Sequence, residues 1–586
     1  MSDDMASDAT TAAANDQTWG RVIIAGGTDW ANVGKKDKSG KSLVNQDVHP
    51  DLYEPHVMRP LCNVPIVSVH GSGCASHFVA IDTYGAAWLW GRNFTSSLGV
   101  SSEQTPVIDT ARPARLMPSQ LGAPRGTKFV HAAVGRGHTV LVASNGSAWA
   151  SGTNTHSQCG RNSSESEITR FTLLENLPAS DNHVIQASAG VSFTMVLTNT
   201  GKVYAFGSAE HGQLGNGATG EDIGPQRKVF FDIIEKPREP VRGLEDKVIK
   251  QIASGNMHSL AVDDEGLVYA WGDGGYCRTG FGDQKEVLIA KPVNGYFMAE
   301  HAATRAWKVF GGPSCSIVID QQKMLSMAGK FKMTGDGSSG QPYTYFKPIE
   351  DLQPYKVETA ASGGMSNFAV APDEDPVDES IPKGTIMTVG WGQQCTHGEL
   401  GMGNEAPLSS TRPNRLDPLA KVHVFDIAAG QHSTVFLARP GDATSNLPRH
   451  PILQHPLECV VCNQDKGDDN SPLECEKCET PYHLSCLNPP LKDVPEDEWF
   501  CEHCTKEAQF EVEEADELAG ETAPNGVPPP KKDEAPVAPT QVANDNTNGQ
   551  PAPEADDGAN GDGLKRKAED AAPAGEDAEA KKPRVE

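Results

Sequence analysis

The feature that most limits how this chain can fold is a unit of roughly sixty residues that recurs through most of its length. In each copy an apolar strand that contains a glycine leads into a hairpin, and a second strand ends in an aromatic residue and a glycine. The clearest copy has its strands at residues 252–262 and 268–272, and alternating apolar residues mark both. The glycine that closes each turn supplies a positive φ; it recurs as Gly85, Gly146, Gly201 and Gly266.

The two halves of the unit differ in number, and this difference predicts how the assembly closes. Only six second halves follow the seven first halves, which begin near Gly73, Gly135, Gly190, Gly255, Gly312, Gly363 and Gly430. Residues 21–26 have the character of a second half and precede every first half. We expect this strand to pair with the last copy, around residues 424–437, and to complete a ring of seven four-stranded blades whose sheet edges are protected.

The length and motifs of the repeat point to one family of such rings. The repeat is longer than the ~40–45 residues of WD40 blades and the ~50 of kelch blades. It carries a Gly-x-x-His-(Ser/Thr) motif and an aromatic-Gly pair followed by Gly-x-Leu-Gly, as at residues 206–215. In these motifs the chain resembles the regulator of chromosome condensation family, and residues 27–30, 272–276 and 398–401 are most similar to the subgroup that includes the telophase disc protein. The resemblance implies a mainly β fold, with residues 18–440 forming a seven-bladed β-propeller.

Four histidines stand at the same position of the repeat: His77, His138, His258 and His432. A residue that recurs once per unit normally faces the shared core, so hydrogen-bonded packing is favoured over a catalytic or metal-binding set.

Two copies of the repeat depart from the pattern. The copy at residues 320–322 lacks a turn glycine, and residues 373–382 form an acidic insertion.

A second region is defined by eight candidate metal ligands in the spacing C-x2-C-x12-C-x2-C-x4-H-x2-C-x14-C-x2-C. They are Cys459, Cys462, Cys475, Cys478, His483, Cys486, Cys501 and Cys504. Zinc prefers tetrahedral thiolate and imidazole ligands, and four closely spaced pairs predict two zinc ions. A segment of about fifty residues buries too little surface to fold alone, so the metal would supply the missing free energy. The alternative, a disulfide framework, is disfavoured by an odd total of 13 cysteines and by the lack of a secretory signal.

The order of the ligands identifies the kind of zinc module. The histidine stands fifth, and Trp499 lies two residues before Cys501. Residues 457–506 therefore resemble a plant homeodomain (PHD) finger rather than a RING finger, whose histidine is fourth, and a ubiquitin ligase is disfavoured. The resemblance implies interleaved ligation: Cys459, Cys462, His483 and Cys486 for one ion, and Cys475, Cys478, Cys501 and Cys504 for the other. A proline-containing linker, residues 441–456, is expected to join this finger to the propeller.

The PHD resemblance also implies a ligand, the amino-terminal tail of histone H3 added as a strand. The matching edge is Leu473 and Glu474, where main-chain pairing would give affinity. Glu476 and Glu479 correspond to the acidic pair with which readers of the unmodified tail bind an arginine, and a guanidinium suits such a pair. Alternatively, these two side chains are only solvated surface acids.

Two further positions refine this expectation. Pro481 stands where readers of trimethyl-lysine carry a cage tryptophan, so the finger is expected to favour the unmodified tail. The main-chain carbonyls of Pro495 and Glu496 are implied to hold the first amine of the peptide. Trp499 is expected to belong to the small core of the finger, because large aromatic side chains are usually buried for packing.

Both ends of the chain differ in composition from the rest. Residues 1–17 are small and polar, and residues 507–586 are acidic with almost no aromatics, so both are expected to be disordered. Two basic clusters interrupt the acidic tail and resemble a bipartite nuclear import signal: Lys565, Arg566, Lys567, Lys581, Lys582 and Arg584. We therefore expect the protein in the nucleus.

Charge and composition limit the partners. The net charge of −28 disfavours direct sequence-specific DNA binding and suits a basic histone. No apolar stretch reaches the ~18 residues of a membrane span. We expect a chromatin-associated interaction protein without chemistry of its own, whose propeller contacts nucleosomes or proteins. The alternative is guanine-nucleotide exchange on a small GTPase of the Ran or Rac type, although no residue can be matched to an exchange loop.

Overall fold

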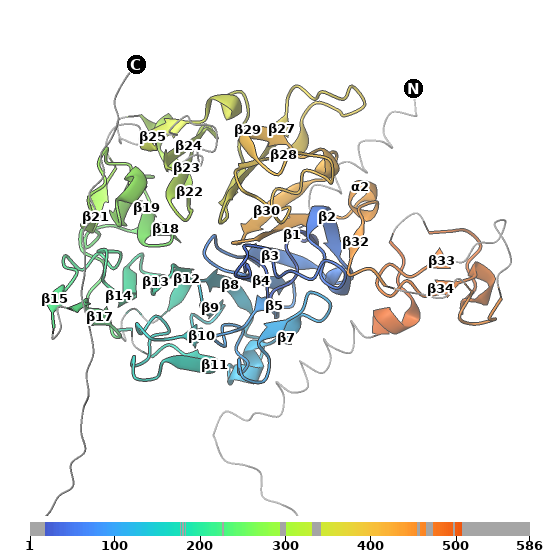
Figure 1. Cartoon of the computed structure of the whole chain (residues 1–586), viewed down its shortest axis with the longest axis horizontal. Helices are drawn as coiled ribbons and strands as arrows, with labels where there is room; N and C mark the ends of the chain where they lie inside the picture. Colours follow the sequence, from blue (N-terminus) through green and yellow to red (C-terminus); the bar gives the residue numbers. More distant parts are fainter. Residues whose placement is uncertain are drawn as a thin grey trace, which may run out of the picture. The chain divides into compact units, whose positions relative to one another are not determined.

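The computed structural model describes residues 18–175, 177–178, 181, 183–224, 228–293, 301–330, 342–453, 458–464, 473–495 and 498–506. The expected disordered ends, residues 1–17 and 507–586, lie outside this part of the chain, as do the two basic clusters. Within it, strands form seven sheets of four or five strands and two short two-stranded sheets. The seven larger sheets surround a common centre as the blades of a β-propeller (Figure 1).

Six blades are each built from strands of one continuous stretch of chain, and in one of them the hairpin β15–β16 intervenes before the last strand. The first strand of each blade lies nearest the centre (Figure 1). Three of them comprise β3 (Ile66–His70), β4 (His77–Asp82), β5 (Ala87–Arg92), β6 (Val107–Ile108) and β7 (Ala114–Leu116); β8 (Phe129–Val134), β9 (His138–Ala143), β10 (Ala148–Thr153) and β11 (Glu167–Leu173); and β12 (Val184–Ala189), β13 (Phe193–Thr198), β14 (Val203–Ser208) and β17 (Ile233–Ile234). A separate hairpin consists of β15 (Asp222–Ile223) and β16 (Val229–Phe230).

The next three blades repeat the arrangement with four strands each. They comprise β18 (Ile249–Ser254), β19 (His258–Asp263), β20 (Val268–Gly272) and β21 (Val287–Pro292); β22 (Ala306–Gly311), β23 (Cys315–Asp320), β24 (Leu325–Gly329) and β25 (Tyr343–Pro348); and β26 (Thr359–Ser362), β27 (Ser366–Asp373), β28 (Thr385–Gly392) and β29 (Ser410–Arg415). Short 3₁₀ turns connect several strands: η1 (Arg59–Leu61), η2 (Pro118–Leu121), η5 (Gly275–Cys277), η6 (Ala302–Thr304), η7 (Glu350–Leu352) and η8 (Asp417–Leu419).

The last blade joins the two ends of the propeller. Its strands, in spatial order, are β30 (Val424–Ala429), β31 (Ser433–Ala438), β1 (Arg21–Gly26), β2 (Leu52–Met58) and β32 (Arg449–His450). Strand β1 pairs antiparallel with β31, with Ile23 opposite Phe436. This confirms the prediction of a seven-bladed ring closed by the amino-terminal strand. It also places both ends of the propeller in one sheet, so that the ring has no open seam.

One detail of the predicted repeat was wrong. The first half, expected as a single strand containing a glycine, is two strands, because β18 ends at Ser254 and β19 begins at His258. At Gly255 an added Cβ would lie 2.1 Å from Cε1 of His258 and 2.4 Å from the Gly312 carbonyl oxygen. The glycine of the Gly-x-x-His motif therefore makes room for the imidazole ring at the end of the inner strand.

The copy without a turn glycine keeps the turn geometry. Lys323 occupies the glycine position between β23 and β24 with φ of 69°, and Gly266 in the neighbouring blade has φ of 81°. The Asp320 carboxylate accepts the backbone N–H groups of Gln322 and Met324, both at 2.9 Å. These hydrogen bonds hold the left-handed turn although a non-glycine residue is disfavoured there.

The segment expected to be a linker, residues 441–456, instead contributes structure to the closing blade up to residue 450. It contains α2 (Asp442–Ser445) and β32, and β32 pairs parallel with β2 through Val57 and Arg449. Prolines suggested an extended connection, but the backbone groups of β32 find partners at the edge of the sheet. Residues 454–456 lie outside the described residues.

The blades are held together by apolar side chains between the sheets. The largest fully buried side chains include Trp90, Trp271 and Trp391, one at the end of the third strand in each of three blades. None of the 13 cysteines, all of which lie in the described part of the chain, forms a disulfide. No helix among the described residues has the length and apolar character needed to span a membrane.

Candidate metal centre and its contacts with the propeller

The eight predicted ligands lie in two groups of four. Their ligand atoms are within 4.8 Å of one another in each group, in the interleaved pairing that the resemblance implied: Cys459, Cys462, His483 and Cys486 in one, and Cys475, Cys478, Cys501 and Cys504 in the other. Each group combines two residues from one Cys-x2-Cys turn with two from a later segment. Because the two groups alternate along the chain, a metal ion in each would tie the finger together twice.

The donor atoms fit zinc in kind and spacing. Nδ1 of His483 lies 3.3 Å from the Cys462 sulfur and 3.9 Å from the Cys486 sulfur, and the sulfurs of Cys478 and Cys501 are 3.7 Å apart. Such separations suit four ligands at about 2.0–2.3 Å from one tetrahedral ion. The backbone N–H of His483 donates to the Cys459 sulfur at 3.3 Å. This contact favours a thiolate, the form of cysteine that binds a metal.

Only a small amount of regular structure supports the two groups. Strand β33 (Leu473–Glu474) pairs antiparallel with β34 (Pro481–Tyr482), and η10 (Leu484–Cys486) follows the histidine ligand. The rings of Tyr482 and Trp499 meet edge to face with centroids 5.6 Å apart. Trp499 thus packs within the finger, as the sequence led us to expect.

The residues expected to bind a peptide are placed as follows. Leu473 is half-buried and Glu474 is exposed, and in the described part of the chain β33 pairs with β34 alone. Pro481 is buried opposite Glu474. Pro495 is half-buried, whereas Glu496 lies outside the described residues. Among the described residues, the outer edge of β33 has no strand partner.

The acidic pair of the finger contacts arginines of the propeller. Glu479 forms an ion pair with Arg59, which lies in η1 directly after β2, and Glu476 forms one with Arg449 of β32. Arg59 also donates from Nη1 to the Glu476 carbonyl oxygen at 3.2 Å and from Nε to the Pro451 carbonyl oxygen at 2.9 Å. Burial raises the pKa of the Glu476 carboxyl, and the Arg449 charge opposes this shift. These two carboxylates are thus not simply solvated.

A third ion pair and several polar contacts complete this interface. Glu498 accepts hydrogen bonds from Nε and Nη2 of Arg21, at 2.9 and 2.8 Å, and from the Ser445 hydroxyl at 3.1 Å. The Asn63 amide donates to the Cys504 carbonyl oxygen at 3.1 Å, and Phe500 packs against the core of the closing blade. All of the propeller groups in the three ion pairs belong to the closing blade or follow it directly. Sequence patterns gave no sign of these contacts.

Three of the four predicted repeat histidines, His77, His138 and His258, have a structural role between blades. Nε2 of His138 lies 2.9 Å from the Thr194 hydroxyl of the next blade, and that hydroxyl donates to the Gln158 carbonyl oxygen, so the histidine must be the donor. His77 contacts Thr139 of the next blade in the same way, again at 2.9 Å. Burial lowers the pKa of His138 to about 4. These neutral rings join neighbouring blades, and no metal or substrate is needed to explain them. The prediction was wrong for His432, because Ser433 takes the paired position opposite Gly26 and His432 lies just before β31, with its ring 3.8 Å from the Glu399 carboxylate.

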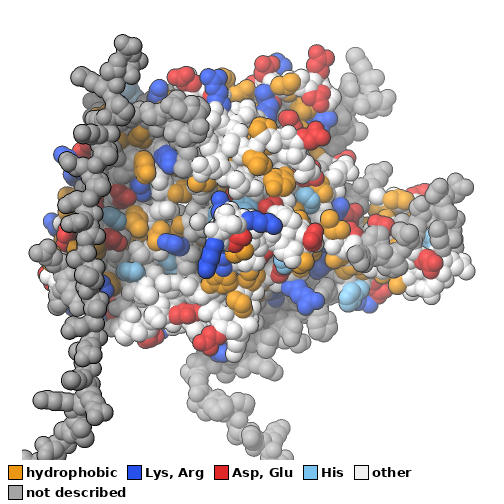
Figure 2. Space-filling model, in the orientation of Figure 1, with side chains coloured by type: hydrophobic (Ala, Val, Ile, Leu, Met, Phe, Trp, Pro, Cys, Tyr) orange, Lys and Arg blue, Asp and Glu red, His pale blue; other side chains and the backbone are white. Residues whose placement is uncertain are grey.

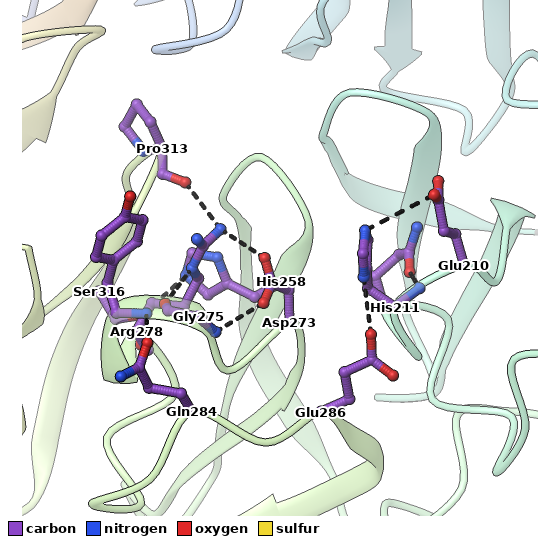
Figure 3. Close-up of polar contacts among 12 residues, drawn as sticks. Glu210, His211, His258, Asp273, Gly275, Arg278, Gln284, Glu286, Pro313 and Ser316 are labelled. Carbon is purple, nitrogen blue, oxygen red and sulfur yellow. Dashed lines mark hydrogen bonds and ion pairs between the residues drawn. The ribbon is translucent and has the colours of Figure 1, made fainter. Parts of the chain in front are cut away.

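Figure 3 shows the version of this contact between the blades of β19 and β23. His258 meets the Ser316 hydroxyl at 2.9 Å, and that hydroxyl donates to the Arg278 carbonyl oxygen at 2.7 Å. The Arg278 guanidinium contacts the Asp273 carboxylate at 3.1 Å and the Pro313 carbonyl oxygen at 3.2 Å. His258 of one blade and Ser316 of the next thus hold the loop after β20 through the Arg278 carbonyl oxygen.

The surface charge of the propeller is uneven. Figure 2 shows several Lys and Arg side chains near the middle of the face turned toward the viewer, with Asp and Glu side chains scattered around them. The net charge of −28 therefore coexists with local positive charge. Such a patch can contact a negatively charged partner, because local rather than total charge acts at short range.

Comparisons with known proteins agree with both regions. A model of the RCC1-like domain matches residues 21–436, and a model of the PHD finger matches residues 459–504. The RCC2 homolog of Xenopus laevis is 29% identical over 432 residues, covering 72% of this chain and 78% of that protein. Human protein RCC2 is 27% identical over 437 residues, covering 72% and 77%. The crystal structure of Prp20p from Saccharomyces cerevisiae matches with a TM-score of 0.54 at 17% identity, covering 72% of this chain and 92% of that one.

Fold and site together define a seven-bladed propeller protein that carries a Cys/His finger with two sets of metal ligands. The family model covers well over half of the chain and extends from the first strand of the propeller into β31. The chain therefore belongs to the RCC1-like domain family, with a PHD finger after the propeller.

Proposed function

We propose that this protein is a nuclear, chromatin-associated interaction protein whose PHD finger binds two zinc ions and the unmodified amino-terminal tail of histone H3. The observation that carries the proposal is the strand edge of β33, presented beside the two ligand groups. An extended peptide added to such an edge gains main-chain hydrogen bonds along its length. Zinc acts here as a structural ion that fixes the edge in place.

The chemistry of the finger favours an unmodified basic peptide. A trimethyl-lysine site needs ring faces around the quaternary ammonium, and the position corresponding to the cage tryptophan is Pro481, which is buried in β34. Glu476 and Glu479 offer carboxylates to an arginine, the group they already contact within this chain. The carbonyls of Pro495 and Glu496 would take the first amine of the peptide.

The propeller would act as a platform for nucleosomes or proteins. Support comes from the local positive charge on one face and from the relative Prp20p, whose structure was reported with its binding properties to Gsp1p and histones. The protein would reach the nucleus through the two basic clusters of the tail, which lie outside the described residues. The propeller would carry out no chemical reaction.

A second candidate function is regulation or nucleotide exchange on a small GTPase. It is favoured by the likeness to RCC2 proteins and to Prp20p, which binds Gsp1p. The test is release of a fluorescent nucleotide from Ran-type and Rac-type GTPases in the presence of the full chain. Accelerated release would support exchange, and an unchanged rate with both would leave the platform role.

The histone proposal is tested with the full chain and two H3 tail peptides, one unmodified and one trimethylated at its first lysine. We expect binding of the unmodified peptide, weaker binding of the trimethylated one, and loss of both after zinc is removed by a chelator. Preference for the trimethylated peptide, or binding that survives chelation, would refute the proposal.

A further inference from the structure

The guanidinium-binding groups of the finger are already occupied within this chain. Glu479 contacts Arg59, and Glu476 contacts Arg449. Both arginines come from the closing blade or directly after it, more than 20 residues away from either carboxylate in sequence. These ion pairs therefore join two separately folded regions, the finger and the closing blade, and are not contacts within one turn.

The ion pair between Arg59 and Glu479 is largely buried. The Arg59 side chain is only 5% exposed and that of Glu479 20%. Arg59 is also fixed from two other directions, by the carbonyl oxygens of Pro451 and Glu476. A guanidinium held by three acceptors at a partly buried site replaces much of its hydration, and charge-assisted hydrogen bonds of this kind are stronger than neutral ones.

The Arg449 pair is more open to solvent. The Arg449 side chain is 17% exposed and that of Glu476 27%. The exposed fraction lets an incoming group approach Glu476 before Arg449 has left. A stepwise exchange of one guanidinium for another could thus begin at Glu476 and continue to Glu479.

We infer that Arg59 and Arg449 mask the acidic pair, so that an arginine-bearing peptide binds the finger in competition with the arginines of the propeller. This inference rests on the proposed function, because it names the regulation of the same peptide site. The competitor has the same chemistry as the groups it displaces. Peptide binding therefore releases the carboxylates from the closing blade, and Arg21 with Glu498 remains as the third ion pair that tethers the finger.

The test compares peptide affinity of the full chain with that of the double variant Arg59→Gln and Arg449→Gln. The probes are the unmodified H3 tail peptide and the same peptide with alanine in place of its first arginine. The double variant should bind the arginine peptide about tenfold more tightly or better, because its carboxylates no longer have to release a charge-assisted hydrogen bond before the peptide binds. The alanine peptide should bind both proteins equally.

Two further variants serve as controls. Arg112, an exposed arginine between β6 and β7, is replaced in Arg112→Gln, which should behave as the unaltered chain. Arg449→Gln alone changes the more exposed pair and should give a smaller gain, which guards against a folding defect caused by loss of the buried Arg59. Thermal unfolding of each variant checks that the propeller is intact.

The outcomes separate this inference from the proposed function. Equal affinity of the arginine peptide for the unaltered chain and the double variant would overturn the masking. If no protein binds any H3 peptide, the proposed function fails, and hydrogen–deuterium exchange of the finger then decides the masking alone. Faster exchange in the double variant supports the contact, and unchanged exchange refutes it.

Discussion

The propeller and the finger show two different ways of holding a chain together. The propeller closes on itself through β1 and β31 and fills the space between its sheets with side chains such as Trp271. The finger has one small cluster, in which cysteine ligands pack with Tyr482, Trp499 and Phe500. A large core can be stabilised by apolar burial, whereas about fifty residues cannot and depend on metal. Removal of zinc should therefore unfold the finger and leave the stability of the propeller almost unchanged.

The largest expected effect comes from removing a metal ligand. Cys459→Ser should lower bound zinc from two ions to one and unfold the finger, because structural zinc contributes about 10–16 kcal/mol to such domains. Metal analysis of the purified full chain measures the ions, and limited proteolysis reports the finger. Cys159→Ser is the matched control, since Cys159 is buried in the propeller outside both ligand groups. Equal zinc content in the two variants would contradict the assignment.

The propeller should respond to the opposite kind of change. Trp271 is fully buried and donates from Nε1 to the Gln213 carbonyl oxygen at 2.9 Å. Trp271→Ala should lower the free energy of unfolding by about 3–5 kcal/mol, as large-to-small core changes do, and should leave the zinc content at two. Urea denaturation measures the loss. Tyr84→Ala, at a 46% exposed position, should cost much less, and a similar loss for both would argue against a core role.

A change at the interface between the finger and the closing blade should have an intermediate effect on stability. Glu498→Gln leaves the Arg21 guanidinium, whose side chain is 8% exposed, without its carboxylate. Removing one partner of such a buried pair costs about 3 kcal/mol. We expect faster hydrogen–deuterium exchange where the finger meets the closing blade, with blades on the far side of the ring unchanged. Exchange that is unaltered everywhere would show that this pair does not hold the finger.

The smallest effect concerns pH and belongs to the propeller alone. His138 has a folded pKa of about 4, against 6.5 for the free side chain, because it is buried. The unfolded chain therefore binds more protons between these values, so the stability from this group is complete above pH 6.5 and is lost as pH falls toward 4. His138→Gln should reduce this loss by about 2 kcal/mol at pH 4.5. Unfolding curves at pH 7 and pH 4.5 measure it, and an equal loss in both proteins would refute the assignment.

Much of the fold was predictable because its signals are local. Turn glycines such as Gly266 and the alternation of apolar residues lie within a few positions of one another, and counting half-repeats located the closing strand. The ligand groups were predictable because cysteine spacing reflects the reach of a tight turn. The split of the first half at Gly255 was missed, since an apolar run interrupted by one glycine looks continuous in sequence.

The contacts of the acidic pair could not be predicted. Glu479 and Arg59 are 420 residues apart, and no local pattern marks an arginine as the partner of a distant carboxylate. Prolines in residues 441–456 suggested a simple linker, but pairing at a sheet edge depends on the tertiary position of β2. The partners of the repeat histidines were hidden for the same reason, because Thr194 follows His138 by 56 residues.

Hydrogen–deuterium exchange of the full chain, with and without a zinc chelator, tests the central contrast most directly. We predict that chelation removes protection from residues 458–464, 473–495 and 498–506, while β18 to β29 keep theirs. Loss of protection throughout the propeller, or a finger that stays protected without metal, would contradict this account.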